Sequence, residues 1–228
     1  MAGELESLHG NEPLAARIER HDYDRMVMLS DGVFAIAITL LALELPLPHA
    51  WDGRLQSLAV AAGPALLGYL FAFLIVGAFW LMHRRIYAQL LRVDRFVSVI
   101  TLAILGLVGL SPFIARLVTE IGPTKGMVAY VALVSSVTFL QVVLWFYAMN
   151  RPGMIHAEVT AAERRSVLFR FGSIALVWGA LALWAVLRDE TLKGELIAAA
   201  AVISLAIRRL SLHLLGKNAD SGSAAAAD

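Results

Sequence analysis

Asp31 is an acidic residue that lies one to two helical turns into an apolar run of the sequence that covers residues 26–47. It lies between Ser30, whose hydroxyl can form local hydrogen bonds, and Gly32, which permits close approach of another helix. In a membrane-spanning helix a carboxylate is costly unless it is paired, so Asp31 is a candidate functional residue. The alternative interpretation is that Asp31 lies near the membrane interface and only holds neighbouring helices together.

Trp80 and His83 are the candidate partners of Asp31. They are three residues apart, so they share one face of a helix at the end of a second apolar run. That end lies on the side of the membrane where the first run begins. An indole N–H, an imidazole nitrogen and a guanidinium group can each bond a carboxylate, which predicts a network of Arg25, Ser30, Asp31, Trp80 and His83. The alternative is that Trp80 belongs to an interfacial aromatic belt and that His83 contacts lipid headgroups.

The apolar side chains of the first run follow a helical period. At about 100° per residue, Ile36, Leu40 and Leu43 form one narrow stripe, and Thr39 lies about 60° from it. Asp31 lies about 140° from Ile36 on the same helix. Either the stripe lines a pathway and Asp31 faces neighbouring helices, or Asp31 lines the pathway and the stripe is ordinary packing.

The composition places these residues in a polytopic membrane protein. Of the 228 residues, 59% are hydrophobic and 16% are charged, and the mean hydropathy is +0.73. These values exclude a soluble globular domain and a disordered chain. A helix needs about 20 apolar residues to cross a bilayer. Six runs approach this length, which predicts an all-α protein with six transmembrane helices, at residues 26–47, 57–82, 96–118, 126–149, 166–187 and 192–207.

The distribution of Lys and Arg predicts the orientation of these helices. Fourteen of the 19 lie before the first run or after an even-numbered run, and basic residues favour the cytoplasmic side. Both termini are therefore predicted to be cytoplasmic. The predicted parts are a cytoplasmic N-terminal segment at 1–25, a six-helix transmembrane domain at 26–210 and a cytoplasmic tail at 211–228 that we expect to be disordered.

Three segments carry a longer pattern. Arg25 is followed by an uninterrupted motif from Leu29 to Leu41, a second segment runs from Phe79 to Arg85, and the third is Leu110-Ser111-Pro112-Phe113. Together they resemble the endolysosomal and prokaryotic potassium channel family built from six-helix repeats. The matching features of that family are an arginine plus phenylalanine-serine-aspartate signature, a Trp and His pair, and a proline-phenylalanine segment. Leu29 replaces the usual phenylalanine and Ser111 a common leucine, but neither departure touches the residues assigned to conduction.

The resemblance implies a potassium-permeable cation channel whose first helices line a central pore. By the motif, an aliphatic gate falls on Ile36, Leu40 and Leu43, with Thr39 as a polar layer close to it. The sequence contains no Thr-Val-Gly-Tyr-Gly filter. Family members with one repeat per chain assemble as tetramers, so a homotetramer in a prokaryotic plasma membrane is expected, with potassium as the permeant ion. The network around Asp31 would then position the first helix.

An enzyme and a transporter are the rival classes. The chain has no Cys, no His-Glu-x-x-His spacing and no glycine-rich phosphate loop, so no catalytic, metal or cofactor site is predicted. A formal net charge of +1 gives no reason to expect a nucleic-acid partner, and the expected surroundings are the lipid bilayer and other copies of the chain. Alternatively, Asp31 and His83 relay protons, which would make the protein a proton-coupled transporter or a proton leak.

Overall fold

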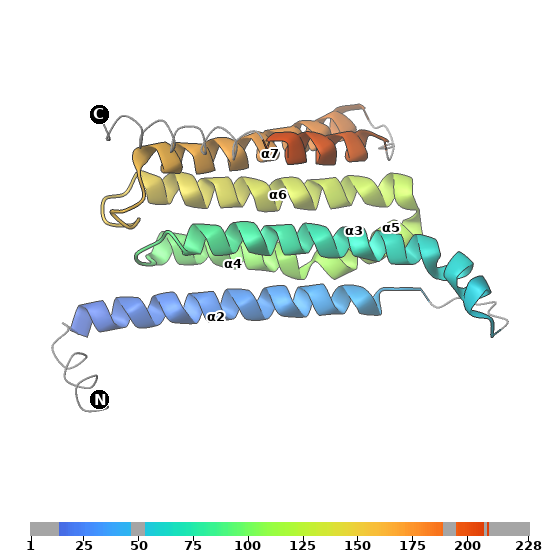
Figure 1. Ribbon diagram of the computed structural model, residues 1–228, viewed down its shortest axis with the longest axis horizontal. Helices are drawn as coiled ribbons and strands as arrows, with labels where there is room; N and C mark the ends of the chain where they lie inside the picture. Colours follow the sequence, from blue (N-terminus) through green and yellow to red (C-terminus); the bar gives the residue numbers. More distant parts are fainter. Residues whose placement is uncertain (1–13, 47–52, 189–194, 208, 210–228) are drawn as a thin grey trace, which may run out of the picture.

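Every regular element in the part of the chain that the structure describes is a helix (Figure 1). The computed structural model describes residues 14–46, 53–188, 195–207 and 209. The named helices are α2 (Leu14–Leu43), α3 (Leu55–Tyr87), α4 (Arg95–Gly109), α5 (Ser111–Ile121), α6 (Pro123–Met149) and α7 (Ala161–Arg188), and a further helix covers Glu195–Ile207. The predicted C-terminal tail at 211–228 lies outside the described residues.

Five helical segments of the described chain are long and apolar enough to cross a membrane. They are Arg17–Leu43, Leu55–Tyr87, Arg95–Ile121, Gly126–Met149 and Ala161–Ala185. The sixth predicted span is the short helix Glu195–Ile207, which covers only about 20 Å at 1.5 Å per residue. A hydrocarbon core is about 30 Å thick. The prediction of an all-helical membrane protein is therefore confirmed, with five rather than six helices long enough to span.

Helix α2 begins before the boundary predicted from hydropathy. Its 30 residues start at Leu14, inside the segment that was expected to precede the membrane domain. At 1.5 Å per residue the helix is about 45 Å long, which exceeds the thickness of the hydrocarbon core. The polar first turns of α2 thus continue the spanning helix beyond its apolar part.

The third predicted span is broken rather than continuous. Pro112 has no N–H to donate to the carbonyl of Val108, and α4 ends at Gly109 just before it. The Ser111 hydroxyl donates to that carbonyl instead, at 2.7 Å. The freed acceptor is satisfied, and α5 begins at Ser111, directly after the interruption at Leu110.

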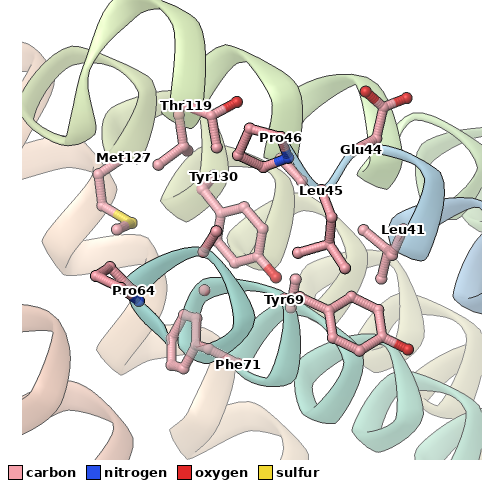
Figure 2. A pocket seen from close by; sticks show the side chains of 15 residues that line it. Leu41, Glu44, Leu45, Pro46, Pro64, Tyr69, Phe71, Thr119, Met127 and Tyr130 are labelled. Carbon is pink, nitrogen blue, oxygen red and sulfur yellow. The ribbon is translucent and has the colours of Figure 1, made fainter. Parts of the chain in front are cut away.

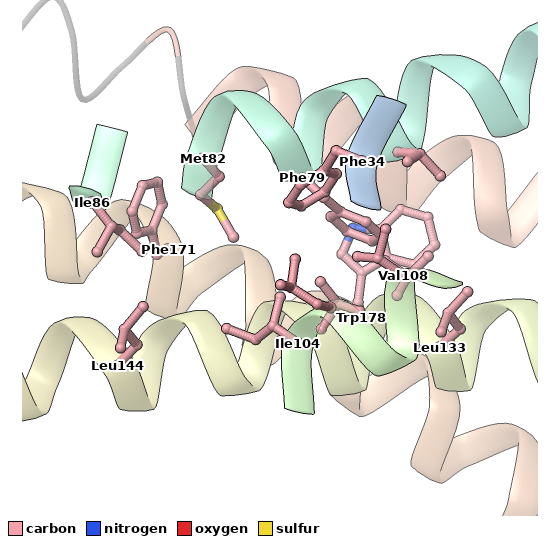
Figure 3. Packing of buried hydrophobic residues seen from close by; sticks show 14 of the residues in the cluster. Phe34, Phe79, Met82, Ile86, Ile104, Val108, Leu133, Leu144, Phe171 and Trp178 are labelled. Atoms are coloured by element: carbon pink, nitrogen blue, oxygen red, sulfur yellow. The ribbon is translucent and has the colours of Figure 1, made fainter. Parts of the chain in front are cut away.

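The helices pack as a bundle in which α6 is central. α6 contacts α3, α4, α5 and α7, whereas α2 packs on α3, α4 and α5 at the opposite side from α7 (Figure 1). The interior is filled by large apolar side chains from five helices, including Phe34, Phe79, Met82, Ile86, Ile104, Val108, Leu133, Leu144, Phe171 and Trp178 (Figure 3). The buried Gln141 amide of α6 donates to the Phe79 carbonyl of α3 at 3.3 Å, an interhelical bond of the kind that stabilises membrane bundles.

Two connections meet at the end of the bundle where α2 begins, the predicted cytoplasmic end. The connection between α3 and α4 forms an antiparallel bridge with the connection between α6 and α7, at Leu90 and Ile155. The Leu91 N–H donates to Met154 O at 2.8 Å, and the His156 N–H to Gln89 O at 3.1 Å. Leu90, Met154 and Ile155 are buried, so the two connections close this end of the core.

Candidate functional site

Helix α2 has one face in the protein and one face turned outwards. Ser30, Phe34, Ala37 and Leu41 are buried and recur with the period of a helix. Because these residues hold one side of α2 against α3, α4 and α5, the opposite side is left open in a single chain.

The predicted gate residues lie on the outward side of α2. The exposed fraction is 60% for Ile36, 41% for Leu40 and 78% for Leu43. Thr39 is also exposed, and its hydroxyl donates to the carbonyls of Ala35 at 3.1 Å and Ile36 at 2.9 Å. The Thr39 proton is thus used within the helix, while the oxygen keeps lone pairs that face outwards.

Ser30 and His83 form a buried contact between α2 and α3. The His83 Nε2 atom lies 3.2 Å from the Ser30 hydroxyl oxygen, and both residues are almost completely buried. The Ser30 hydroxyl already donates to the Met26 carbonyl at 2.8 Å, so His83 must be the donor in the contact with Ser30. His83 Nδ1 then carries a lone pair, and this atom has no hydrogen-bond partner in the described structure.

Asp31 and Trp80 form the neighbouring contact. The Trp80 indole N–H donates to Asp31 Oδ1 at 2.8 Å. The Asp31 side chain is otherwise exposed, and the Arg84 guanidinium lies over the Trp80 ring, 5.5 Å from its centroid. The carboxylate therefore has a donor from α3 while it faces away from the outward stripe of α2.

The structure does not bring Arg25 to this pair of contacts. Arg25 lies nearer the start of α2, where it lines a recess together with Asp22, Asp94 and Arg95. Among the described residues, neither a hydrogen bond nor an ion pair joins it to Asp31. Four of the five predicted network residues are thus in contact as two pairs, Ser30 with His83 and Asp31 with Trp80.

No group of three or more His, Asp or Glu side chains in the described ranges is placed to hold a metal ion. What the site presents instead is an outward apolar face with a hydroxyl at its edge and a polar anchor behind it.

Comparison with known proteins identifies the relatives of the chain. A potassium channel from Streptomyces collinus is 30% identical over 158 residues, which make up 66% of this chain and 77% of the relative. The family model described as endosomal/lysosomal potassium channel TMEM175 matches residues 25–112. The chain belongs to the TMEM175 family. This is a family of channels rather than enzymes.

One further relative and one solved structure are also similar to this chain. An endosomal/lysosomal proton channel TMEM175 from Danio rerio is 30% identical over 121 residues, 49% of this chain and 22% of that protein. The crystal structure of a lysosomal potassium-selective TMEM175 homologue from Chamaesiphon minutus has the same fold. It aligns with a TM-score of 0.61 over 84% of this chain and 98% of that chain, at 22% identity.

The stretch that matches the TMEM175 model contains every predicted site residue. It begins at Arg25 and extends through α3 and α4 to Pro112 at the start of α5. Helices α6 and α7 lie outside it. The family signal is therefore concentrated on the helix with the outward face and on the helices that hold it.

Three further polar residues in or beside this stretch, Tyr23, Tyr87 and Thr101, were not predicted as site residues. The Tyr23 hydroxyl donates to the Tyr87 carbonyl at 2.8 Å, and the Tyr87 hydroxyl lies 2.7 Å from that of Thr101. Tyr87 follows His83 by four residues, a spacing that places both on one helix face and that could have indicated the contact. These bonds extend the attachment of α2 to α3 and α4.

Proposed function

We propose that this protein is a potassium-permeable cation channel formed by four copies of the chain. The α2 helices of the copies surround a central pore, with Ile36, Leu40 and Leu43 as an aliphatic gate and Thr39 as a polar layer beside it. The protein is proposed to lie in the plasma membrane with both termini in the cytoplasm. Membership of the TMEM175 family supports this assignment.

The observation that carries the proposal is the outward face of α2. A single helix cannot enclose a pathway. The outward side of α2 has no covering helix among the described residues, so other copies of the chain could pack there. Ile36, Leu40 and Leu43 are 41–78% exposed, and no charged residue occurs between Ile36 and Leu43. Several copies that turn this face to one axis would produce an aliphatic constriction.

The gate is expected to work through water. A narrow ring of aliphatic side chains expels water, and a cation that passes it must give up part of its hydration shell. A small rotation of α2 would widen the ring and admit water. Asp31 precedes Ile36 by about 7.5 Å along the helix axis, so its bond to Trp80 restrains this rotation close to the gate.

The test is potassium flux into liposomes that contain the purified protein. Ile36→Asn adds a polar group to the constriction, and we expect the resting flux to rise because water enters the gate. Leu176→Asn is the matched control, since Leu176 is 75% exposed on α7, on the other side of the bundle from α2. Equal flux through the wild type and Ile36→Asn, with intact oligomers, would contradict the gate assignment.

A proton pathway is the second candidate. The Danio rerio relative is named a proton channel, and His83 offers a buried ring nitrogen without a partner in the described structure. Asp31 and His83 do not bond to each other, so a relay between them requires an intervening water. A pH-sensitive dye in the same liposomes distinguishes the two functions. Proton entry that Asp31→Asn removes, without potassium flux in any variant, would favour the proton pathway.

A further inference from the structure

A cavity of about 190 Å³ lies at the end of the bundle where α2 ends (Figure 2). Its walls come from the end of α2, the first half of α3, and the adjoining parts of α5 and α6. Leu41, Leu45, Phe71, Val118 and Met127 are among the apolar side chains that line it. The cavity is separate from the outward face of α2 and from the contacts of Asp31 and His83.

The sequence of α3 explains why space remains there. Pro64 lies within the helix and cannot donate to the carbonyl one turn earlier, which favours a bend. Ala65, Gly68 and Ala72 also line the cavity and are too small to fill it. A Cβ atom added at Gly68 would meet no heavy atom within 4 Å, so the space beside this residue is open.

One polar group points into this apolar space. Tyr130 of α6 is only 4% exposed, and its hydroxyl has no hydrogen-bond partner among the described residues. Figure 2 shows this oxygen directed into the cavity among the side chains of α2 and α3. A buried hydroxyl without a partner is costly, so a ligand that supplies one has an advantage over a purely apolar one.

The charged residue at the rim of the cavity, Glu44, gives no reason to expect a bound cation. Glu44 lines the cavity, but its carboxylate lies 3.9 Å from the Arg116 guanidinium. Figure 2 shows the Glu44 carboxylate directed away from the cavity. Thr119 and Tyr69 also line the cavity, but the Thr119 hydroxyl donates to the Arg116 carbonyl at 2.8 Å, and Figure 2 shows the Tyr69 hydroxyl directed away from Tyr130. The Tyr130 hydroxyl is therefore the group that a ligand in this apolar space could pair with.

We propose that this cavity binds a small uncharged amphiphile, a ring or short chain with a single hydrogen-bonding oxygen that pairs with Tyr130. An apolar cavity of about 150 Å³ in another protein accommodates benzene, so the volume suits a molecule of this size. Such a molecule dissolves in the bilayer and reaches the site from it. The proposal concerns binding and is independent of whether the protein conducts potassium or protons.

Fluorine NMR on the full chain in lipid nanodiscs tests the proposal. The probe is meta-fluorobenzyl alcohol, and the matched probe without the hydroxyl is meta-fluorotoluene. Empty nanodiscs measure partition into lipid alone. We expect saturable binding of the alcohol to the wild type that is about fivefold weaker in Tyr130→Phe, the loss expected for one hydrogen bond. Binding of meta-fluorotoluene should be equal in these two proteins.

Gly68→Leu supplies the second arm, because a leucine side chain would occupy the cavity. We expect this variant to lose saturable binding of both probes. Elution from a size-exclusion column as the same oligomer as wild type shows that a variant folds. If Gly68→Leu does not fold, the comparison of wild type with Tyr130→Phe decides alone. Signals that match empty nanodiscs would overturn the site. Equal binding of the alcohol to wild type and Tyr130→Phe would overturn recognition by the hydroxyl.

Discussion

The indole nitrogen of Trp80 lies 2.8 Å from Asp31 Oδ1, and this bond joins the helix with the outward face to the next helix in the chain. Beside it, His83 donates to Ser30 across the same pair of helices at 3.2 Å. Ser30 and Asp31 are adjacent, whereas Trp80 and His83 are three residues apart. The two bonds therefore fix both the rotation of α2 and its depth against α3.

Loss of the indole donor should weaken the attachment of α2. Trp80→Phe keeps an aromatic ring but leaves Asp31 without this partner. Hydrogen bonds to charged groups contribute about 1.5–3 kcal/mol, and the exposure of Asp31 reduces this to roughly 1 kcal/mol. A double-mutant cycle with Asp31→Asn, measured as free energy of unfolding in detergent, should return a coupling of that size.

Trp184→Phe is the control for the size of the side chain. Trp184 lies on α7, away from α2. Its replacement should show no coupling to Asp31→Asn. A coupling near zero for Trp80 and Asp31 as well would mean that the bond does not hold α2.

The contact between Ser30 and His83 fixes the tautomer of the histidine. Because the Ser30 proton is given to Met26, neutral His83 should carry its proton on Nε2. Nitrogen NMR of labelled histidine should show this tautomer. Ser30→Ala leaves the buried N–H without an acceptor, which should cost about 1–3 kcal/mol of stability. A protonated Nδ1 in the wild type would contradict the assignment.

Periodicity in the sequence predicts which residues share a face but not which of them meet. It places Trp80 with His83 on α3 and separates Asp31 from the stripe at Ile36, as the structure has them. It does not predict that Trp80 donates its hydrogen bond to Asp31, because this pairing depends on how α2 is rotated against α3. That rotation is set by packing between residues distant in sequence, such as Phe34 and His83, whose rings lie 5.6 Å apart.

Other features of the fold differ in whether the sequence around them indicates their presence. The break in the third span is indicated, because Pro112 cannot continue the hydrogen bonding of α4. The bridge between Leu90 and Ile155 is not, since it joins two connections that are separated by the three helices α4, α5 and α6. The gate at Ile36, Leu40 and Leu43 and the tetramer stay predictions, because both depend on further copies of the chain.

Asp94 should make the stability of the folded protein depend on pH in the acidic range. It caps α4 by accepting from the Val97 N–H at 2.9 Å, and the Tyr147 hydroxyl donates to its other oxygen at 2.6 Å. Burial raises the pKa of the Asp94 carboxyl, but these hydrogen bonds, aided by the Arg151 charge, outweigh it and hold the pKa below its ordinary value. The ionised form is thus favoured in the folded protein.

A lowered pKa in the folded state gives stability that is complete above the ordinary Asp value and is lost as the pH falls through the folded value. The melting temperature of Tyr147→Phe should therefore lie below that of wild type at pH 6. The difference should narrow below about pH 4. A difference that stays constant down to pH 3 would show that Tyr147 acts through packing alone, for example on the Phe96 ring at 4.2 Å.

Gly126 is expected to be the glycine least tolerant of a side chain in the described part of the chain. A Cβ atom there would lie 2.5 Å from Val118 Cα and 2.9 Å from Leu117 O, which are backbone atoms of the preceding helix that cannot move aside cheaply. Gly126→Ala should therefore force α5 and α6 apart and lower the melting temperature sharply.

Gly179→Ala is the control, because a Cβ atom at Gly179 on α7 meets nothing within 4 Å and alanine favours a helix. It should leave stability unchanged or raise it by up to about 1 kcal/mol. Equal melting temperatures for the two variants would show that α5 and α6 approach less closely than this structure has them.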